Sequence, residues 1–70
     1  MNNLKKTLAR CKITEKQLIS ETGFAQGRLN HYAENRRQPK KDVAAIIVSA
    51  LVKLGGKNLK LKDVFPEVAK

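Results

Sequence analysis

The sequence predicts an all-α fold, a single small domain of five short helices spanning residues 1–70. Seventy residues suffice for one small domain with a thin core. Apolar residues recur at helical spacing in successive segments, and Gly23, Pro39 and the Gly55-Gly56 pair interrupt the pattern. The run Ile46-Ile47-Val48 resembles a strand in isolation, but the spacing and length of the surrounding pattern favour a helix.

The first predicted helix carries one apolar stripe. Leu4, Leu8 and Cys11 recur at i, i+4 and i+7, and basic residues surround them. Cys11 is the only cysteine, so we expect no internal disulfide, and its side chain should pack as a small hydrophobe. One cysteine and one histidine form no metal-ligand cluster of ordinary spacing, and we expect neither a metal nor another cofactor.

The second predicted helix has a well-defined start and end. Thr14 and Gln17 have the spacing of a capping box, in which each side chain accepts a hydrogen bond from the other residue's backbone N–H. The helix should run to about Thr22. Gly23 is expected to end it in the left-handed conformation, and Phe24 then turns back into the core.

The third predicted helix covers about Gln26 to Ala33 and has two different faces. Leu29 and Tyr32 share the inner face. The helix contains a glycine and lacks a Ser or Asp cap, so packing against the rest of the domain must hold it. Five residues lie on or beside its outer face: Gln26, Gly27, Arg28, Asn30 and His31.

The fourth predicted helix supplies much of the core. It should begin near Asp42, as its N-cap, and end at Gly55-Gly56. Six apolar residues follow its repeat: Val43, Ile46, Ile47, Ala50, Leu51 and Leu54. Val48 and Val52 lie off this stripe, where the C-terminal tail or a second subunit could cover them. A last short helix is expected from Leu61 to Phe65.

The chain is strongly basic, with 15 Lys and Arg residues, 6 Asp and Glu residues and a formal net charge of +9. Such an excess opposes compaction of a small domain and indicates a polyanionic partner, with nucleic acid as the first candidate. The sequence contains neither a signal peptide nor a run long enough to span a bilayer, so we expect a cytoplasmic protein. Ser20 and Ser49 lie in no nucleophile context, and no small-molecule site is evident; nothing supports an enzyme.

Residues 14–34 have the pattern of a helix-turn-helix, which a basic loop follows. Amide and guanidinium side chains match the hydrogen-bonding edges of bases in the major groove. We therefore expect the five outer-face residues of the third helix to face bases, with Gln26 suited to adenine and Arg28 to guanine or a phosphate. Gly27 would allow close approach of the backbone. Four cations of the loop are expected to bind phosphates: Arg36, Arg37, Lys40 and Lys41.

These elements resemble the Cro/repressor-type helix-turn-helix, or XRE family, of phage and bacterial regulators. The similarity covers roughly residues 4–65. It rests on Thr14, Leu18, Gly23, Phe24, Leu29, Tyr32, Arg36-Arg37, Pro39, Leu54-Gly55 and Asp63-Val64-Phe65. The resemblance implies a lambda-repressor-like fold and a homodimeric, Cro-like repressor on a pseudo-palindromic operator in double-stranded DNA. It also implies a location at the nucleoid of a bacterial or phage-infected cell.

The chain departs from this family pattern inside the motif. Ile19 occupies a position that is usually alanine, and Glu15 one where many members carry a glutamine that touches phosphate. Ala25 replaces a serine-like cap, and Asn35 replaces the usual glycine. Four apolar residues are weak candidates for a dimer contact, with core packing as the alternative: Val48, Val52, Leu59 and Val68.

Other classes of function remain open. An antitoxin of a toxin–antitoxin pair is a protein-interaction module that often uses this same fold. A non-specific nucleic-acid-binding architectural protein, or an RNA-binding protein, is another. The chain has only one tyrosine and two phenylalanines, all assigned to the core or its edge, so stacking platforms for single strands are missing. A cationic membrane peptide is disfavoured because no helix combines a wide apolar face with most of the charge.

Overall fold

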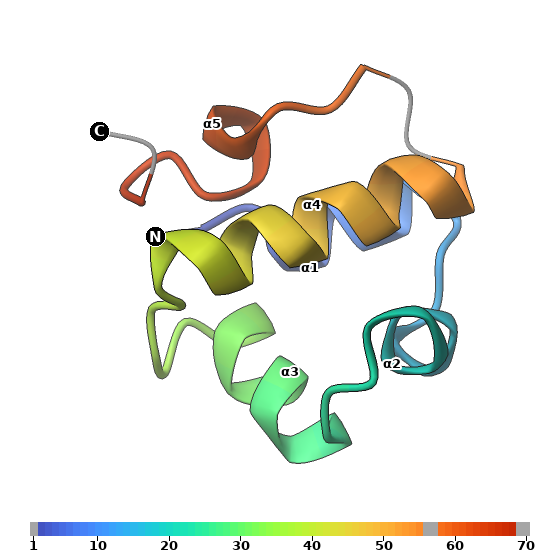
Figure 1. Cartoon of the computed structure of the whole chain (residues 1–70), viewed down its shortest axis with the longest axis horizontal. Coiled ribbons are helices and arrows are strands. Elements are labelled where there is room, and N and C mark those ends of the chain that lie inside the picture. Colours follow the sequence, from blue (N-terminus) through green and yellow to red (C-terminus); the bar gives the residue numbers. More distant parts are fainter. Residues whose placement is uncertain (1, 56–57, 69–70) are drawn as a thin grey trace.

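Five helices follow one another in the part of the chain that the structure, a computed structural model, describes: residues 2–55 and 58–68. They are α1 (Leu4–Cys11), α2 (Glu15–Thr22), α3 (Gln26–Ala33), α4 (Lys41–Leu54) and α5 (Leu61–Val64) (Figure 1). These residues contain no β-strand, so the all-α prediction is confirmed, and each helix lies where the apolar pattern indicated. No helix among them is long and apolar enough to cross a membrane.

Helix α4 is the centre around which the other helices pack. In Figure 1 it runs across the middle of the molecule with α1 behind it, α2 and α3 below it and α5 above it. Contacts join α2 to both α3 and α4, α5 to α4, and α1 to α3. The largest fully buried side chains come from every helix or its edge: Leu4, Leu18, Leu29, Ile47, Leu51, Val64 and Phe65. Burying one such side chain stabilises the fold by about 2 kcal/mol.

The apolar arc of α4 differs from the predicted stripe. Ile46, expected on the stripe, is 49% exposed, whereas Val48, expected off it, is only 8% exposed. The prediction was wrong for both because α4 is covered by α2 on one side and by α5 on another. Two neighbouring helices bury a wider arc of the α4 surface than one neighbour would, and they shift the centre of that arc. Val48 lies within it.

The start of α4 also differs from the prediction. The helix begins at Lys41, and its N-cap is Lys40, not Asp42. Pro39 is buried, and the extended Lys40 leads from it into the helix. Asp42 lies in the first turn, where its Oδ1 accepts a hydrogen bond of 2.9 Å from the Val43 N–H. Its negative charge interacts favourably with the positive end of the helix dipole.

The N-terminal segment ties α1 to the ends of α3 and α5, which the sequence did not predict. Asn2 is 8% exposed, and its Nδ2 donates to the Tyr32 carbonyl at 2.6 Å. The Asn2 backbone N–H donates to Asn35 Oδ1 at 2.7 Å, and Asn2 Oδ1 accepts from the Leu4 N–H at 3.1 Å. The Asn3 N–H donates to the Val64 carbonyl at 2.7 Å. We call this segment, Asn2 and Asn3, the N-terminal clip.

Candidate nucleic-acid interface

Helix α2 is fixed at both of its ends. The predicted capping box is present: the Thr14 N–H donates to Gln17 Oε1 at 2.9 Å, and the Gln17 N–H donates to Thr14 Oγ1 at 3.1 Å. At the other end Gly23 has φ 79°, and its N–H donates to the Ile19 carbonyl at 2.7 Å. This left-handed residue is the predicted stop. The chain therefore leaves α2 at a defined residue and in a defined direction before it enters α3.

Helix α3 is held by packing, as predicted from its weak intrinsic preference for the helical state. Its N-cap, Ala25, makes no side-chain capping hydrogen bond. Its inner face is buried instead, with Leu29 1%, Tyr32 7% and Ala33 6% exposed. Loss of this packing would leave a short helix that is unstable in water. The position of α3 thus depends on the core beneath it.

The outer face of α3 presents three exposed residues, Gln26, Gly27 and Arg28. Asn30 and His31, the other two predicted base-reading residues, are half-buried. His31 Nδ1 is enclosed and has no hydrogen-bond partner among the residues described. The exposed part of the outer face thus lies toward the N-terminal end of α3.

Arg28 is not a freely moving side chain. Its Nε donates a hydrogen bond of 3.0 Å to the Tyr32 hydroxyl. Its Cζ lies 4.7 Å from the centre of the Phe24 ring and 6.0 Å from that of Tyr32. The i, i+4 spacing of Arg28 and Tyr32 allows this contact, but the sequence pattern placed Tyr32 only in the core. We call these three residues the Arg28 clamp.

The loop after α3 begins with a tight turn that displays the predicted cations. Asn35 has φ 62°, in the left-handed region. The N–H groups of Arg36 and Arg37 then donate to the His31 carbonyl at 2.8 and 3.3 Å. The four predicted phosphate-binding residues are all exposed: Arg36, Arg37 and Lys40 lie in this loop, and Lys41 is the first residue of α4.

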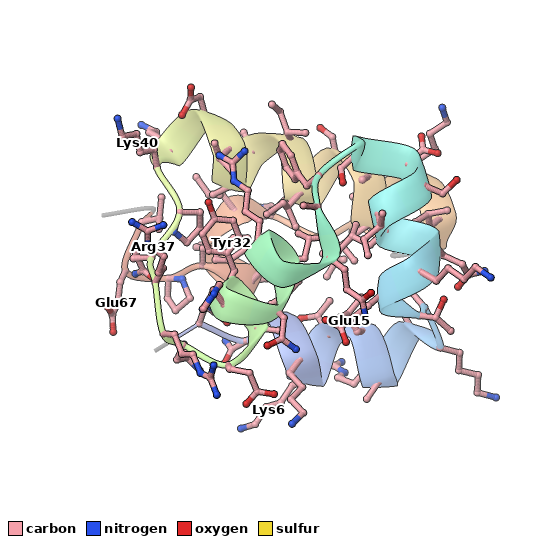
Figure 2. All side chains as sticks on the ribbon, turned by 90° about the horizontal axis from the view of Figure 1, so that it is seen from below. Lys6, Glu15, Tyr32, Arg37, Lys40 and Glu67 are labelled. Atoms are coloured by element: carbon pink, nitrogen blue, oxygen red, sulfur yellow. The ribbon has the colours of Figure 1, made fainter. Side chains whose placement is uncertain are left out.

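Cations lie around the edge of the face that α3 presents. Figure 2 views the molecule from this side; Arg37 and Lys40 project at one edge and Lys6 at another, with Glu15 nearer the middle. Glu34 lies 3.6 Å from Lys5, which neutralises part of its charge. Glu15 is half-buried, and its Oε1 has no hydrogen-bond partner within the described residues. The chain as a whole carries a formal net charge of +9, which favours an anionic partner.

The four dimer candidates lie in different environments. Val48 is part of the core of a single chain. Leu59 and Val68 are half-buried and pack against that core. Val52 is 43% exposed and, with Ile46, is one of the large apolar residues that α4 presents to solvent. Of the four, Val52 is therefore the one with most apolar surface left for another molecule.

Cys11 packs against the core as a partly buried residue, as predicted. Among the described residues, no group of three or more His, Cys, Asp and Glu side chains is placed to hold a metal ion.

Comparison of the chain with models of known protein families, with curated protein sequences and with solved structures found no match.

Proposed function

We propose that this protein is a sequence-specific, double-stranded DNA-binding transcriptional regulator of the Cro/repressor type. The observation that carries the proposal is the pairing of an exposed, polar α3 with a cationic loop directly after it. In this proposal α2, the Gly23 turn and α3 form a helix-turn-helix in a lambda-repressor-like domain. Helix α3 enters the major groove, and α2 crosses the DNA backbone.

The proposed contacts divide into two kinds. Gln26, Arg28 and Asn30 contribute amide and guanidinium groups, which match base edges in the major groove. His31 provides a further polar contact, and Gly27 allows the backbone to come close to the bases. Four cations bind phosphates, which adds affinity but little sequence information: Arg36, Arg37 and Lys40 in the loop and Lys41 at the start of α4.

The simplest mode of control is repression by occupying an operator. In the proposal two copies bind a pseudo-palindromic site, since a two-fold symmetric dimer presents two α3 helices one helical turn of DNA apart. The exposed Val52 is the favoured candidate for a contact between the two copies.

The proposal is tested by selecting bound sequences from a random pool of duplexes and comparing the selected duplex with a scrambled one over a series of salt concentrations. We expect the selected duplex to bind at least about a thousandfold more tightly at physiological salt. Both affinities should fall as salt rises, because counterions are released from phosphates. Equal affinity for the two duplexes at every salt concentration would reject sequence-specific regulation and favour a non-specific architectural protein.

Substitutions separate the two kinds of contact. Gln26→Ala and Asn30→Ala should relax the preference at particular base pairs, each by about 1–3 kcal/mol of discrimination. Arg37→Ala should weaken binding to all duplexes alike and reduce the salt slope by about one. The reverse assignment, with uniform loss from α3 and base-specific loss from the loop, would mean that α3 is not the reading helix.

A further inference from the structure

The Arg28 clamp holds a guanidinium group at the surface by three contacts, which come from Phe24 and Tyr32. Phe24 lies against the guanidinium with Cζ 4.7 Å from the ring centre, and the Tyr32 ring centre is 6.0 Å away. The Tyr32 hydroxyl accepts the hydrogen bond from Nε at 3.0 Å. A cation close to two aromatic rings is attracted by their quadrupoles, and the hydrogen bond fixes which edge of the guanidinium points inward.

Tyr32 is itself firmly placed. It is 7% exposed and belongs to the core. Its backbone carbonyl accepts the hydrogen bond from Asn2 Nδ2 at 2.6 Å. The hydroxyl that receives Arg28 Nε is thus attached to a ring with little freedom to move. Arg28 depends on the core for its orientation, although its own side chain is exposed.

The clamp leaves the outer edge of Arg28 available. Nε is occupied by Tyr32, so the donors that remain are those of the two Nη atoms. Within the described chain no carboxylate forms an ion pair with Arg28; Glu34 pairs with Lys5, and Glu21 pairs with Lys53. Two parallel donors in one plane match two acceptors in one plane. In the major groove that pattern is O6 and N7 of guanine.

We propose that Arg28 reads a guanine through its Nη atoms and that Tyr32 is its positioning residue. This inference rests on the proposed DNA-binding function. Guanine is favoured over phosphate because Arg28 lies in the first turn of α3 beside the exposed Gln26 and Gly27, whereas the loop cations lie beyond the other end of the helix. A fixed planar fork distinguishes guanine from other bases, while attraction to a phosphate requires no fixed geometry.

The test uses the full chain and a duplex obtained by selection. Each guanine of one half-site is replaced in turn by 7-deazaguanine, which lacks the N7 acceptor. For the native protein we expect one such replacement to weaken binding about tenfold, the loss of part of a bidentate contact. Arg28→Lys should abolish that penalty, since an ammonium group cannot form the planar fork.

Tyr32→Phe tests the positioning role because it keeps the ring in the core and removes only the hydroxyl. It should reduce the 7-deazaguanine penalty to about threefold or less, with binding to a scrambled duplex unchanged. Phe24→Leu, which removes the other aromatic contact, should reduce the penalty in the same way and provides a second variant. Arg36→Ala is the matched control: it should weaken binding to every duplex but keep the full penalty.

Each outcome gives a decision. A full penalty in the Tyr32→Phe protein would overturn the positioning role of Tyr32, and a full penalty in the Phe24→Leu protein would show that the Phe24 ring does not contribute to it. Specific binding with no 7-deazaguanine penalty at any guanine, or equal weakening of all duplexes by Arg28→Lys, would overturn guanine reading while leaving sequence-specific binding intact. Absence of any preference between selected and scrambled duplexes would instead reject the proposed function on which this inference rests.

Discussion

The backbone N–H of Asn2 is joined by a 2.7 Å hydrogen bond to Oδ1 of Asn35, thirty-three positions later in the chain. Asn35 adopts a left-handed backbone at the start of the cationic loop. A glycine in its place would reach this conformation more easily but would have no side chain to accept the bond. The residue that lets the chain turn after α3 therefore also fastens the turn to the N-terminal clip.

Loss of the Asn2 side chain should destabilise the domain. Asn2→Ala removes the donor to the Tyr32 carbonyl and the acceptor for the Leu4 N–H, both in buried surroundings. We expect the free energy of unfolding to fall by about 2 kcal/mol, measured by urea denaturation. Lys6→Ala, at a nearby exposed position, is the control and should change it by less than about 0.5 kcal/mol. Equal effects of the two substitutions would contradict a structural role for the clip.

Gly23 and Gly27 lie on either side of the turn between α2 and α3, and substitution by alanine should change the stability of the domain in opposite directions. Gly23→Ala places a side chain at φ 79° and should cost about 1 kcal/mol. Gly27→Ala, inside α3, should instead stabilise by about 0.5–1 kcal/mol. A Cβ at either position meets nothing within 4 Å, so the difference isolates the backbone conformation. Thermal unfolding of both variants measures it, and shifts of the same sign would be incompatible with this account.

The capping box of α2 should be measurable in stability. Thr14→Ala removes the acceptor for the Gln17 N–H and should lower the free energy of unfolding by about 1 kcal/mol. Ser20→Ala, at an exposed position inside the same helix, should raise it by a few tenths of a kcal/mol, because alanine favours the helix. Chemical denaturation of the two variants side by side checks the prediction, which fails if Thr14→Ala is neutral.

Val48 and Val52 should separate folding from association. Val48→Ala should destabilise the single chain by about 2 kcal/mol, since it removes buried methyl groups and leaves a cavity. Val52→Ala should leave unfolding of the monomer nearly unchanged. If Val52 forms a contact between two copies, sedimentation will show weaker self-association for Val52→Ala at the same protein concentration. An unchanged sedimentation profile would exclude Val52 from such a contact.

The ion pair between α2 and α4 should stabilise the fold up to about pH 10.5 and lose its contribution at higher pH. Lys53 Nζ lies 2.8 Å from Glu21 Oε1, and this hydrogen bond and charge raise the pKa of Lys53 above 10.5. Because the folded-state pKa is the higher one, the stabilisation is fully present below about pH 10.5 and is lost as the pH rises through the folded-state pKa. The pair is exposed, so the effect is small and screened by salt.

Urea denaturation of native protein and Lys53→Met over a pH series measures this contribution. The difference in unfolding free energy should be present at neutral pH and low salt and should vanish at strongly alkaline pH. Lys16→Met, at an exposed position of α2, is the control and should show no such loss. A difference that persists unchanged at alkaline pH would show that lost packing, not charge, is its source.

Local signals in the sequence predicted the helices well. Thr14, Gln17 and Gly23 each act through residues close by in the chain, so their spacing alone indicated where α2 begins and ends. The cations after α3 were predicted to bind phosphates, and all four are exposed. Features that depend on contacts between residues far apart in the chain were harder to predict. Ile46 is exposed and Val48 buried, the reverse of the prediction, because α2 and α5 cover α4 from particular directions. The periodicity of the α4 sequence carries no information about those directions.

The candidate interface was predicted as a set of residues but not as an arrangement. Arg28 was assigned to base or phosphate contact and Tyr32 to the core; both placements describe the residues separately. That the hydroxyl of a core tyrosine reaches the surface arginine depends on side-chain directions that sequence spacing leaves open. Asn2 was missed for a similar reason. The sequence around a short polar residue before the first helix does not indicate that its side chain will donate a hydrogen bond to the buried Tyr32 carbonyl.

The backbone hydrogen bond from Asn3 to Val64 closes almost the whole chain into one ring. A closure over so long a stretch of chain has a high entropic cost, which is reduced once the helices between its ends have assembled. We therefore expect α5 to join the domain late during folding and to detach early during unfolding, while α2, α3 and α4 remain together. Hydrogen exchange should accordingly be fastest in α5 and slowest at the centre of α4.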